Sequence, residues 1–158
     1  MLRLSKKADY ALIAMKHLAV RGDRSHQGAL GAQGASSARE IAEQYDIPIE
    51  LMAKVLQRLV RRGLLQSHQG THGGYQLARG PAQISVADVI QAIEGPVTVT
   101  ACTTDEGQCE QFSKCNVRDP LFKVRDRILA ALGECTIAEL AADTVPVPAR
   151  AAVLHTHL

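Results

Sequence analysis

Residues 37–63, SAREIAEQYDIPIELMAKVLQRLVRRG, decide the fold, because they encode two short helices separated by a tight break. Ser37 followed three residues later by Glu40 forms a capping box, which predicts that a helix begins directly after Ser37. Pro48 interrupts the helical pattern and suits the first turn of a second helix, which Gly63 ends. Helix, tight turn and helix is the pattern of a helix-turn-helix.

The second of these helices has two chemically different sides. Its apolar side, with Val55 at the margin, consists of Ile49, Met52, Leu56, Leu59 and Val60. On the other side Lys54, Gln57, Arg58 and Arg61 recur at spacings of three and four residues, as expected for one helical face. We therefore interpret this helix as a recognition helix, with Lys54, Gln57 and Arg58 facing base edges in a major groove.

A β-hairpin is predicted directly after the recognition helix. Residues 64–68 and 75–78 are short strand candidates around a glycine-rich turn. A hairpin in this place is a wing, whose tip can reach phosphates or a neighbouring groove. The residues expected to make these surrounding contacts are Lys6, Lys7, Arg61, Thr71 and His72, and Ser37 is a further candidate DNA contact.

The fold class expected is mainly α, a winged helix-turn-helix with a two-stranded wing and a long additional helix. A first helix is predicted from Ser5 to Gly22, and a further helix begins after the capping residue Ser85. His17, on the first helix, is expected to face solvent or a neighbouring element. The predicted organisation is a DNA-binding domain over residues 1–95 with a mobile loop at 22–36, a cysteine loop at 96–118, a long and a short helix at 119–143, and a flexible tail at 144–158.

The long helix predicted from residue 119 to about residue 132 bears on oligomeric state. Its apolar stripe is Leu121, Val124, Ile128, Leu129 and Leu132. Such a stripe either folds back onto the core of its own chain or packs against a second copy as a dimerisation helix. Because helix-turn-helix proteins usually bind DNA as two-fold dimers, we favour the second interpretation.

Composition excludes several classes of protein. The chain has 158 residues, of which 46% are hydrophobic, 22% charged and only 3% aromatic. So few aromatic side chains argue against a protein that binds single strands by stacking. The sequence contains neither a secretory signal nor an apolar run of the roughly 18 residues that a membrane span needs. We expect a cytoplasmic protein that is not an enzyme and has no membrane partner.

The net charge of +2 conceals two unlike halves. Residues 1–79 carry 12 Lys and Arg against 6 Asp and Glu, whereas residues 80–158 carry 6 against 10. A basic N-terminal half favours a polyanion as partner, with nucleic acid as the first candidate.

Three cysteines lie in one polar stretch of the acidic half. Six residues separate Cys102 from Cys109, and five separate Cys109 from Cys115. Structural zinc sites favour paired thiolates two to four residues apart, so these wider gaps suit a loop around an iron–sulfur cluster. A redox disulfide and cysteines without a role are the alternatives. Cys135 lies outside this stretch, at a helix junction.

Five blocks of the sequence, taken together and in order, resemble the Rrf-type winged-helix regulators, which include the IscR-, NsrR- and RirA-like transcription factors. The blocks are LRLSKKADYALIAMKHLA at 2–19, SAREIAEQYDIPIELMAKVLQRLVRRGLL at 37–65, GTHGGYQLAR at 70–79, ISVADVIQAIEG at 84–95, and Cys102, Cys109 and Cys115 followed by NVRDPLFKV at 116–124. The opening residues look most like regulators of the Suf iron–sulfur assembly operon in gammaproteobacteria. The resemblance implies a homodimer that binds palindromic promoter DNA, with three thiolates holding a cluster whose state sets DNA affinity.

The chain departs from this family at the fourth cluster ligand. Where the family's 2Fe–2S members have a histidine, three residues after the third cysteine, this chain has Arg118, which cannot ligate a metal. In nitric-oxide-sensing members an aspartate from the first helix of the partner subunit completes the site, and Asp9 occupies the matching position. Asp9 is also explained as a carboxylate in the first turn of a helix. Glu110 and Asp105 are weaker candidates, so a 2Fe–2S and a 4Fe–4S cluster both stay open.

These observations lead to one expected function. The chain is predicted to be a sequence-specific transcription regulator, a repressor of iron–sulfur assembly genes that senses an iron–sulfur cluster. The alternatives are a regulator of the same family that senses nitric oxide, iron or redox state, and one whose cysteines bind zinc or form a disulfide.

Overall fold

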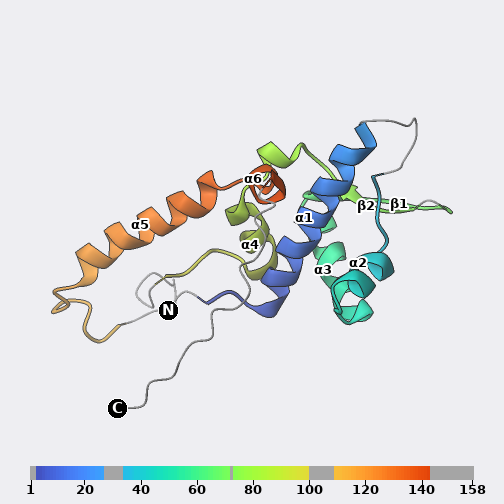
Figure 1. Cartoon of the computed structure of the whole chain (residues 1–158). Coiled ribbons are helices and arrows are strands. Elements are labelled where there is room, and N and C mark those ends of the chain that lie inside the picture. Colours follow the sequence, from blue (N-terminus) through green and yellow to red (C-terminus); the bar gives the residue numbers. More distant parts are fainter. Residues whose placement is uncertain (1–2, 27–33, 72, 100–108, 143–158) are drawn as a thin grey trace, which may run out of the picture.

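A computed structural model describes residues 3–26, 34–71, 73–99 and 109–142 of the chain. In order, its elements are α1 (Lys6–His26), α2 (Ala38–Gln44), α3 (Ile49–Arg61), β1 (Leu65–His68), β2 (Gly74–Leu77), the 3₁₀ helix η1 (Pro81–Gln83), α4 (Val86–Glu94), α5 (Arg118–Glu134) and α6 (Ile137–Ala142). The predicted winged helix-turn-helix is confirmed, with α2 and α3 as its two helices and β1 and β2 as its wing (Figure 1). None of the helices in the part of the chain described here is long and apolar enough to cross a membrane.

α1 is the centre of the body, and it contacts α3, α4, α6 and β2. Its buried face consists of small and medium apolar side chains, which let the neighbouring helices approach closely. The core residues of α1 are Ala8, Ala11, Ala14, Met15, Leu18 and Ala19. Ser5 caps this helix as predicted, because its Oγ accepts the backbone N–H of Ala8 at 3.3 Å.

The sequence predicted that the first helix ends at Gly22, but α1 continues through His26. Glycine lowers helix stability by about 1 kcal/mol without forbidding the helix, and the turns on either side carry it through this position. The predicted mobile loop at 22–36 therefore begins as helix. Its last residue, Ser36, is fully buried and pairs with Tyr75 of β2, while residues 27–33 lie outside the described residues.

The helix-turn-helix forms for the reasons seen in the sequence. The capping box between Ser37 and Glu40 is present in both directions, with distances of 3.2 and 2.7 Å. Asp46 then adopts a left-handed conformation with φ of 53°, which aspartate tolerates better than most residues, and the chain turns into α3 at Pro48. From α3, Met52, Val55, Leu56 and Leu59 enter the core, so Val55 belongs to it fully, whereas Ile49 is exposed.

The wing is a two-stranded antiparallel hairpin, in which Leu65 pairs with Leu77 and His68 with Gly74. These strands differ from the predicted ones by a single residue at the ends. After the wing, Ser85 caps α4 through a second capping box with Asp88, and Gly95, with φ of 83°, ends it. The start of α4 after Ser85 agrees with the sequence prediction.

α5 extends away from the body, and α6 returns to it (Figure 1). None of the residues of α5 is buried. By contrast, Ile137 of α6 is fully buried, and its backbone N–H donates to the carbonyl of Ile84 at 2.9 Å. α6 is thus part of the core around α1, a placement that its short sequence did not indicate.

Candidate DNA-binding surface and cysteine segment

The exposed side of α3 carries the four polar residues predicted for a recognition helix. The buried residues Met52, Leu56 and Leu59 fix the orientation of α3, so the opposite side is presented to solvent. Lys54, Gln57, Arg58 and Arg61 line one open groove together with Lys7 of α1, and Ile93 of α4 forms part of its wall. The structure therefore brings the first turn of α1 and the recognition helix to a single basic surface.

A second groove lies between α3 and the wing. It is lined by Gln57 and Arg61 on one side and by Ser67, His68 and Gln69 on the other. Because Gln57 and Arg61 line both grooves, the two grooves adjoin each other along α3. We call this combined region the basic surface.

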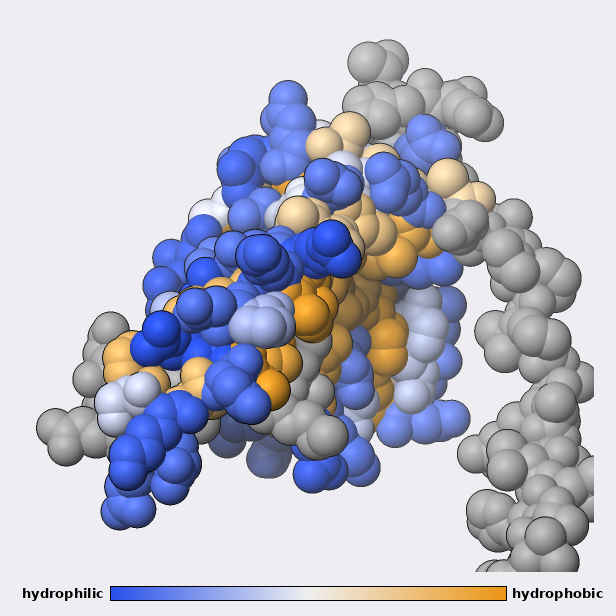
Figure 2. Space-filling view, turned by 90° about the vertical axis from the view of Figure 1, so that its left-hand side faces the viewer, coloured by the Kyte–Doolittle hydropathy of each residue, from blue (hydrophilic) through white to orange (hydrophobic). Residues whose placement is uncertain are grey.

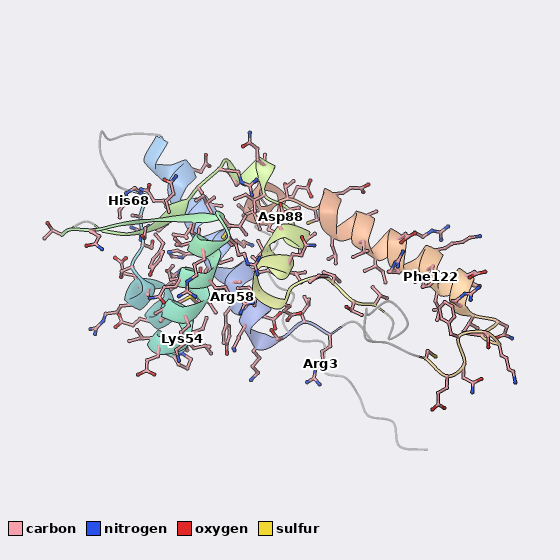
Figure 3. All side chains as sticks on the ribbon, turned by 180° about the vertical axis from the view of Figure 1, so that it is seen from behind. Arg3, Lys54, Arg58, His68, Asp88 and Phe122 are labelled. Atoms are coloured by element: carbon pink, nitrogen blue, oxygen red, sulfur yellow. The ribbon has the colours of Figure 1, made fainter. Side chains whose placement is uncertain are left out.

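The wing contribution to this surface differs in part from the prediction. Thr71 is exposed at the hairpin turn, and His72 lies outside the described residues. His68 is not among the predicted DNA contacts, yet its side chain projects from β1 (Figure 3) and lines the groove. Its place at the end of the first predicted strand, next to the hairpin turn, is the sequence signal that could have identified it.

Ser37 has a structural task at the start of α2. Its Oγ accepts the backbone N–H of Glu40, and its own N–H donates to the Glu40 carboxylate. These bonds hold the pKa of Glu40 below its usual value, chiefly through the backbone N–H of Ser37. The hydroxyl proton of Ser37 is not used in these bonds, so it can donate to a phosphate oxygen of DNA.

Arg58 contacts its own protein as well as solvent. It is an exposed residue, yet its Nε donates to the backbone carbonyl of Ala92 in α4 at 3.0 Å. Guanidinium has five N–H donors in a fixed plane, so the terminal nitrogens can still bind a base or a phosphate. Sequence periodicity could not reveal this tertiary contact.

His17 does not face solvent but is buried against neighbouring elements, the second of the two positions expected for it. Only 7% of it is exposed, its Nδ1 lies 3.1 Å from the Tyr45 hydroxyl, and its Nε2 lies 3.1 Å from Ser36 Oγ. Burial lowers the pKa of His17, the charge of Arg21 lowers it further, and Glu40 opposes the shift. The imidazole thus joins α1 to α2 and to the segment that pairs with the wing.

The cysteine segment is described only in its second half. Cys109 is exposed, Cys115 is half-buried, and neither is in a disulfide, whereas Cys102 and Asp105 lie outside the described residues. Within residues 3–26, 34–71, 73–99 and 109–142, no three His, Cys, Asp or Glu side chains are close enough to hold a metal ion.

Arg118 organises the junction between the cysteine segment and α5. It donates from Nη1 to the Phe112 carbonyl at 3.3 Å, and its guanidinium lies 4.8 Å from the centroid of the Phe112 ring. It also forms an ion pair with Asp119 at 2.8 Å, which holds the pKa of that carboxyl below its usual value. Arg118 thus occupies the position of a possible histidine ligand, and its contacts connect the cysteine segment to α5.

The remaining ligand candidates lie in different places. Glu110 is exposed beside Cys109, and Asp9 is exposed in the first turn of α1. Residues 109–117 lie at the far end of α5, well away from the start of α1 (Figures 1 and 3). Cys135 ends α5 at its other end, where its carbonyl accepts the N–H of Val86 at 2.9 Å.

Comparison with known proteins gives a consistent result. Residues 4–143 match the model of the Rrf2 family, described as an iron-dependent transcriptional regulator. The chain is 30% identical over 139 residues to the HTH-type transcriptional regulator IscR of Xenorhabdus nematophila, covering 88% of this chain and 79% of the relative. IscR of Escherichia coli is 29% identical over the same length.

Solved structures agree with the sequence relatives. CymR, the global cysteine regulator of B. subtilis, superposes with a TM-score of 0.69 at 26% identity, covering 89% of this chain and 97% of CymR. IscR of T. potens superposes with a TM-score of 0.62 at 27% identity, covering 88% of this chain and 85% of that protein.

Proposed function

Because the chain belongs to the Rrf2 family of transcriptional regulators, a family of DNA-binding winged-helix proteins, we propose that it is a sequence-specific regulator whose DNA affinity depends on an iron–sulfur cluster. In this proposal a homodimer binds palindromic promoter DNA and represses iron–sulfur assembly genes.

The basic surface is the observation that carries the DNA-binding part of the proposal. Lys7, Lys54, Arg58 and Arg61 line one groove along α3, and the wing borders the adjoining groove. Cationic side chains around a recognition helix suit the phosphates that flank a major groove, because they release condensed counterions on binding. Lys54, Gln57 and the terminal nitrogens of Arg58 are proposed to contact base edges, while Lys6, Lys7, Ser37, Arg61 and the wing residues Thr71 and His72 contact the DNA backbone or the adjacent groove.

Two substitutions separate base reading from backbone contact. Arg58→Ala is expected to cost about 1–3 kcal/mol at one operator position, because a bidentate base contact is lost. Lys7→Ala is expected to weaken all sequences alike and to reduce the salt slope by about one ion. The measurement is fluorescence anisotropy on a duplex that the wild-type protein selects from a random pool, with single-base variants of that duplex. Uniform losses in both variants would refute this division of roles.

The donor set of the cysteine segment fits an iron–sulfur cluster. Cys109 and Cys115 lie in a loop without regular structure and are not in a disulfide. Cys109 is exposed and Cys115 is half-buried, so neither sulfur is enclosed in the core, and sulfur is a ligand that soft metal ions prefer. Together with Cys102 they supply three of the ligands that such clusters take from proteins. A bound cluster supplies a centre that iron supply, oxidants or nitric oxide can alter.

Anaerobic purification tests this cofactor directly. Visible absorbance and acid-labile sulfide are expected in the wild type and in Cys135→Ala, which is the matched control. Replacement of Cys102, Cys109 or Cys115 by Ala is expected to abolish or destabilise the cluster, and with it the visible absorbance. A colourless wild-type protein loaded with zinc, or colour loss in Cys135→Ala equal to that of the other three, would contradict the assignment.

We assign the fourth ligand to Asp9 of the partner subunit. The start of α1 lies away from residues 109–117 of its own chain (Figure 1), which favours a carboxylate supplied by the partner subunit over one from the same chain. Asp9→Ala should preserve the dimer and the fold while making the cluster more labile, as followed by the decay of its absorbance. An unchanged cluster lifetime would transfer the assignment to Glu110 or to an exogenous ligand.

A further inference from the structure

The last turn of α4 contacts both of the other helices that border the basic surface. The Ala92 carbonyl accepts the Nε–H of Arg58 on the recognition helix at 3.0 Å. Two residues later, the Oε1 of Glu94 accepts the backbone N–H of Ser5 at 2.6 Å, directly before the lysines that open α1. Ile93, between these two residues, is buried and lines the groove with Lys7 and Arg58.

From this geometry we infer that residues 92–94 are a positioning element for DNA binding. They hold the α1 lysines and the Arg58 guanidinium in a fixed position relative to each other. The inference rests on the proposed DNA-binding role of the basic surface. Glu94 is its decisive residue, because it acts through Ser5 and is not itself expected to touch DNA.

The charge of Glu94 makes this role unusual. A carboxylate next to a DNA-binding groove repels phosphates, so its simple removal should strengthen DNA binding. Its contact with Ser5 has the opposite consequence. Ser5 directly precedes α1 and caps it by accepting the N–H of Ala8, so the bond fixes where Lys6 and Lys7 lie relative to α3. The rigid placement of cations before binding reduces the entropy lost when they meet phosphates.

A second contact supports the same conclusion for Arg58. An arginine whose Nε is already bonded to a carbonyl has a fixed guanidinium plane, and its terminal nitrogens present a preset pair of donors. Because Ala92 and Glu94 lie on one helical turn, a displacement of this turn moves both sets of DNA contacts together. Gly95 ends α4, and in the sequence six residues, 96–101, separate Gly95 from Cys102.

The test compares Glu94→Ala with Glu94→Gln, because the amide oxygen of Gln can still accept the N–H of Ser5. Both variants lose the same negative charge. Glu94→Ala is expected to bind the selected duplex about 3- to 10-fold more weakly than the wild type, the loss expected for one charge-assisted hydrogen bond. Glu94→Gln should bind as tightly as the wild type or more tightly. Glu43→Ala, which removes an exposed carboxylate from α2, is the charge control and should not weaken binding.

Hydrogen exchange gives a readout that is independent of DNA. The amides at the start of α1 should lose protection in Glu94→Ala, retain it in Glu94→Gln, and stay unchanged in Glu43→Ala. Equal or tighter DNA binding by Glu94→Ala would overturn the inference, as would equal losses in the Ala and Gln variants. If the wild type itself selects no duplex, the proposed function fails, whereas unchanged exchange at α1 in Glu94→Ala removes the positioning role alone.

Discussion

At the residue scale, the buried imidazole of His17 connects three parts of the DNA-binding body. Its two ring nitrogens contact Tyr45 at the end of α2 and Ser36 before α2. The backbone of Ser36 in turn exchanges hydrogen bonds of 3.1 and 2.8 Å with Tyr75 of the wing. A single side chain of α1 therefore influences how the helix-turn-helix and the wing sit relative to each other.

Protonation of His17 should make the fold pH-dependent. Burial is the largest cause of its lowered pKa in the folded chain, so the unfolded chain binds the proton more readily. The contribution of neutral His17 to the free energy of unfolding is therefore fully present above the unfolded-state pKa of about 6.5. This contribution is lost as the pH falls below that value. Urea unfolding between about pH 5 and pH 7.5 should show this loss in the wild type and a smaller one in His17→Gln. The interpretation fails if the two proteins have the same pH dependence.

At the element scale, the wing is docked onto the segment that begins α2. Gly74 adopts a φ of 153°, and a Cβ at this position would lie 2.7 Å from the carbonyl carbon and oxygen of Ser36. The close approach permits the bridge between Ser36 and Tyr75. The position of the wing next to α3 thus depends on the absence of a side chain at one residue.

Gly74→Ala should displace the wing and weaken DNA binding. The added methyl group meets backbone atoms, and the left-handed φ adds strain, so we expect a loss of about 1–3 kcal/mol in the free energy of unfolding. Gly80→Ala is the matched control, because nothing lies within 4 Å of the Cβ that it adds. Thermal unfolding and DNA titration of both variants check this. Similar behaviour of the two variants would show that wing docking does not need the contact.

At the scale of the whole molecule, α5 is a long helix without a single buried residue in the part of the chain that the structure describes. Leu121 and Val124 are 38% and 46% exposed, and Val117 and Phe112, just before them, are also exposed. Figure 2, which faces the side to which α5 extends, shows apolar residues gathered among hydrophilic ones on this face. Exposed apolar faces of this kind are typical of interfaces, and a second copy of α5 is the partner that the proposed homodimer supplies.

Leu121→Glu should therefore dissociate the dimer. A charge placed in an apolar interface is desolvated without a partner, which costs several kcal/mol. The monomer should also bind a palindromic duplex far more weakly, because its two half-sites are no longer contacted together. Ala130→Glu is the control, because Ala130 is exposed and lies nine residues further along α5, about two and a half turns, on the opposite face of the helix. Light scattering should give a monomer for Leu121→Glu alone, and a dimer in both variants would exclude this face as the interface.

The sequence by itself determined the elements whose causes are local. Helices begin and end where local sequence features place their ends. These features are the capping boxes at Ser37 and Ser85, the break at Pro48, and the glycines at 63 and 95. The polar stripe of α3 follows from helical periodicity, so the predicted recognition face could be identified without coordinates. The end of α1 could not, since Gly22 carries only a modest penalty that the rest of the helix overcomes.

Only the tertiary structure decided which distant residues meet. Four hydrogen bonds join residues that are 19 to 89 positions apart in the sequence, and no periodicity encodes them. They are the bonds of His17 with Tyr45 and with Ser36, of Arg58 with Ala92, and of Glu94 with Ser5. The return of α6 to the core and the exposure of α5 likewise depend on where the chain runs after Cys135. Local hydrogen bonds and periodicity act within a turn of helix, whereas these pairings arise from packing the helices around α1.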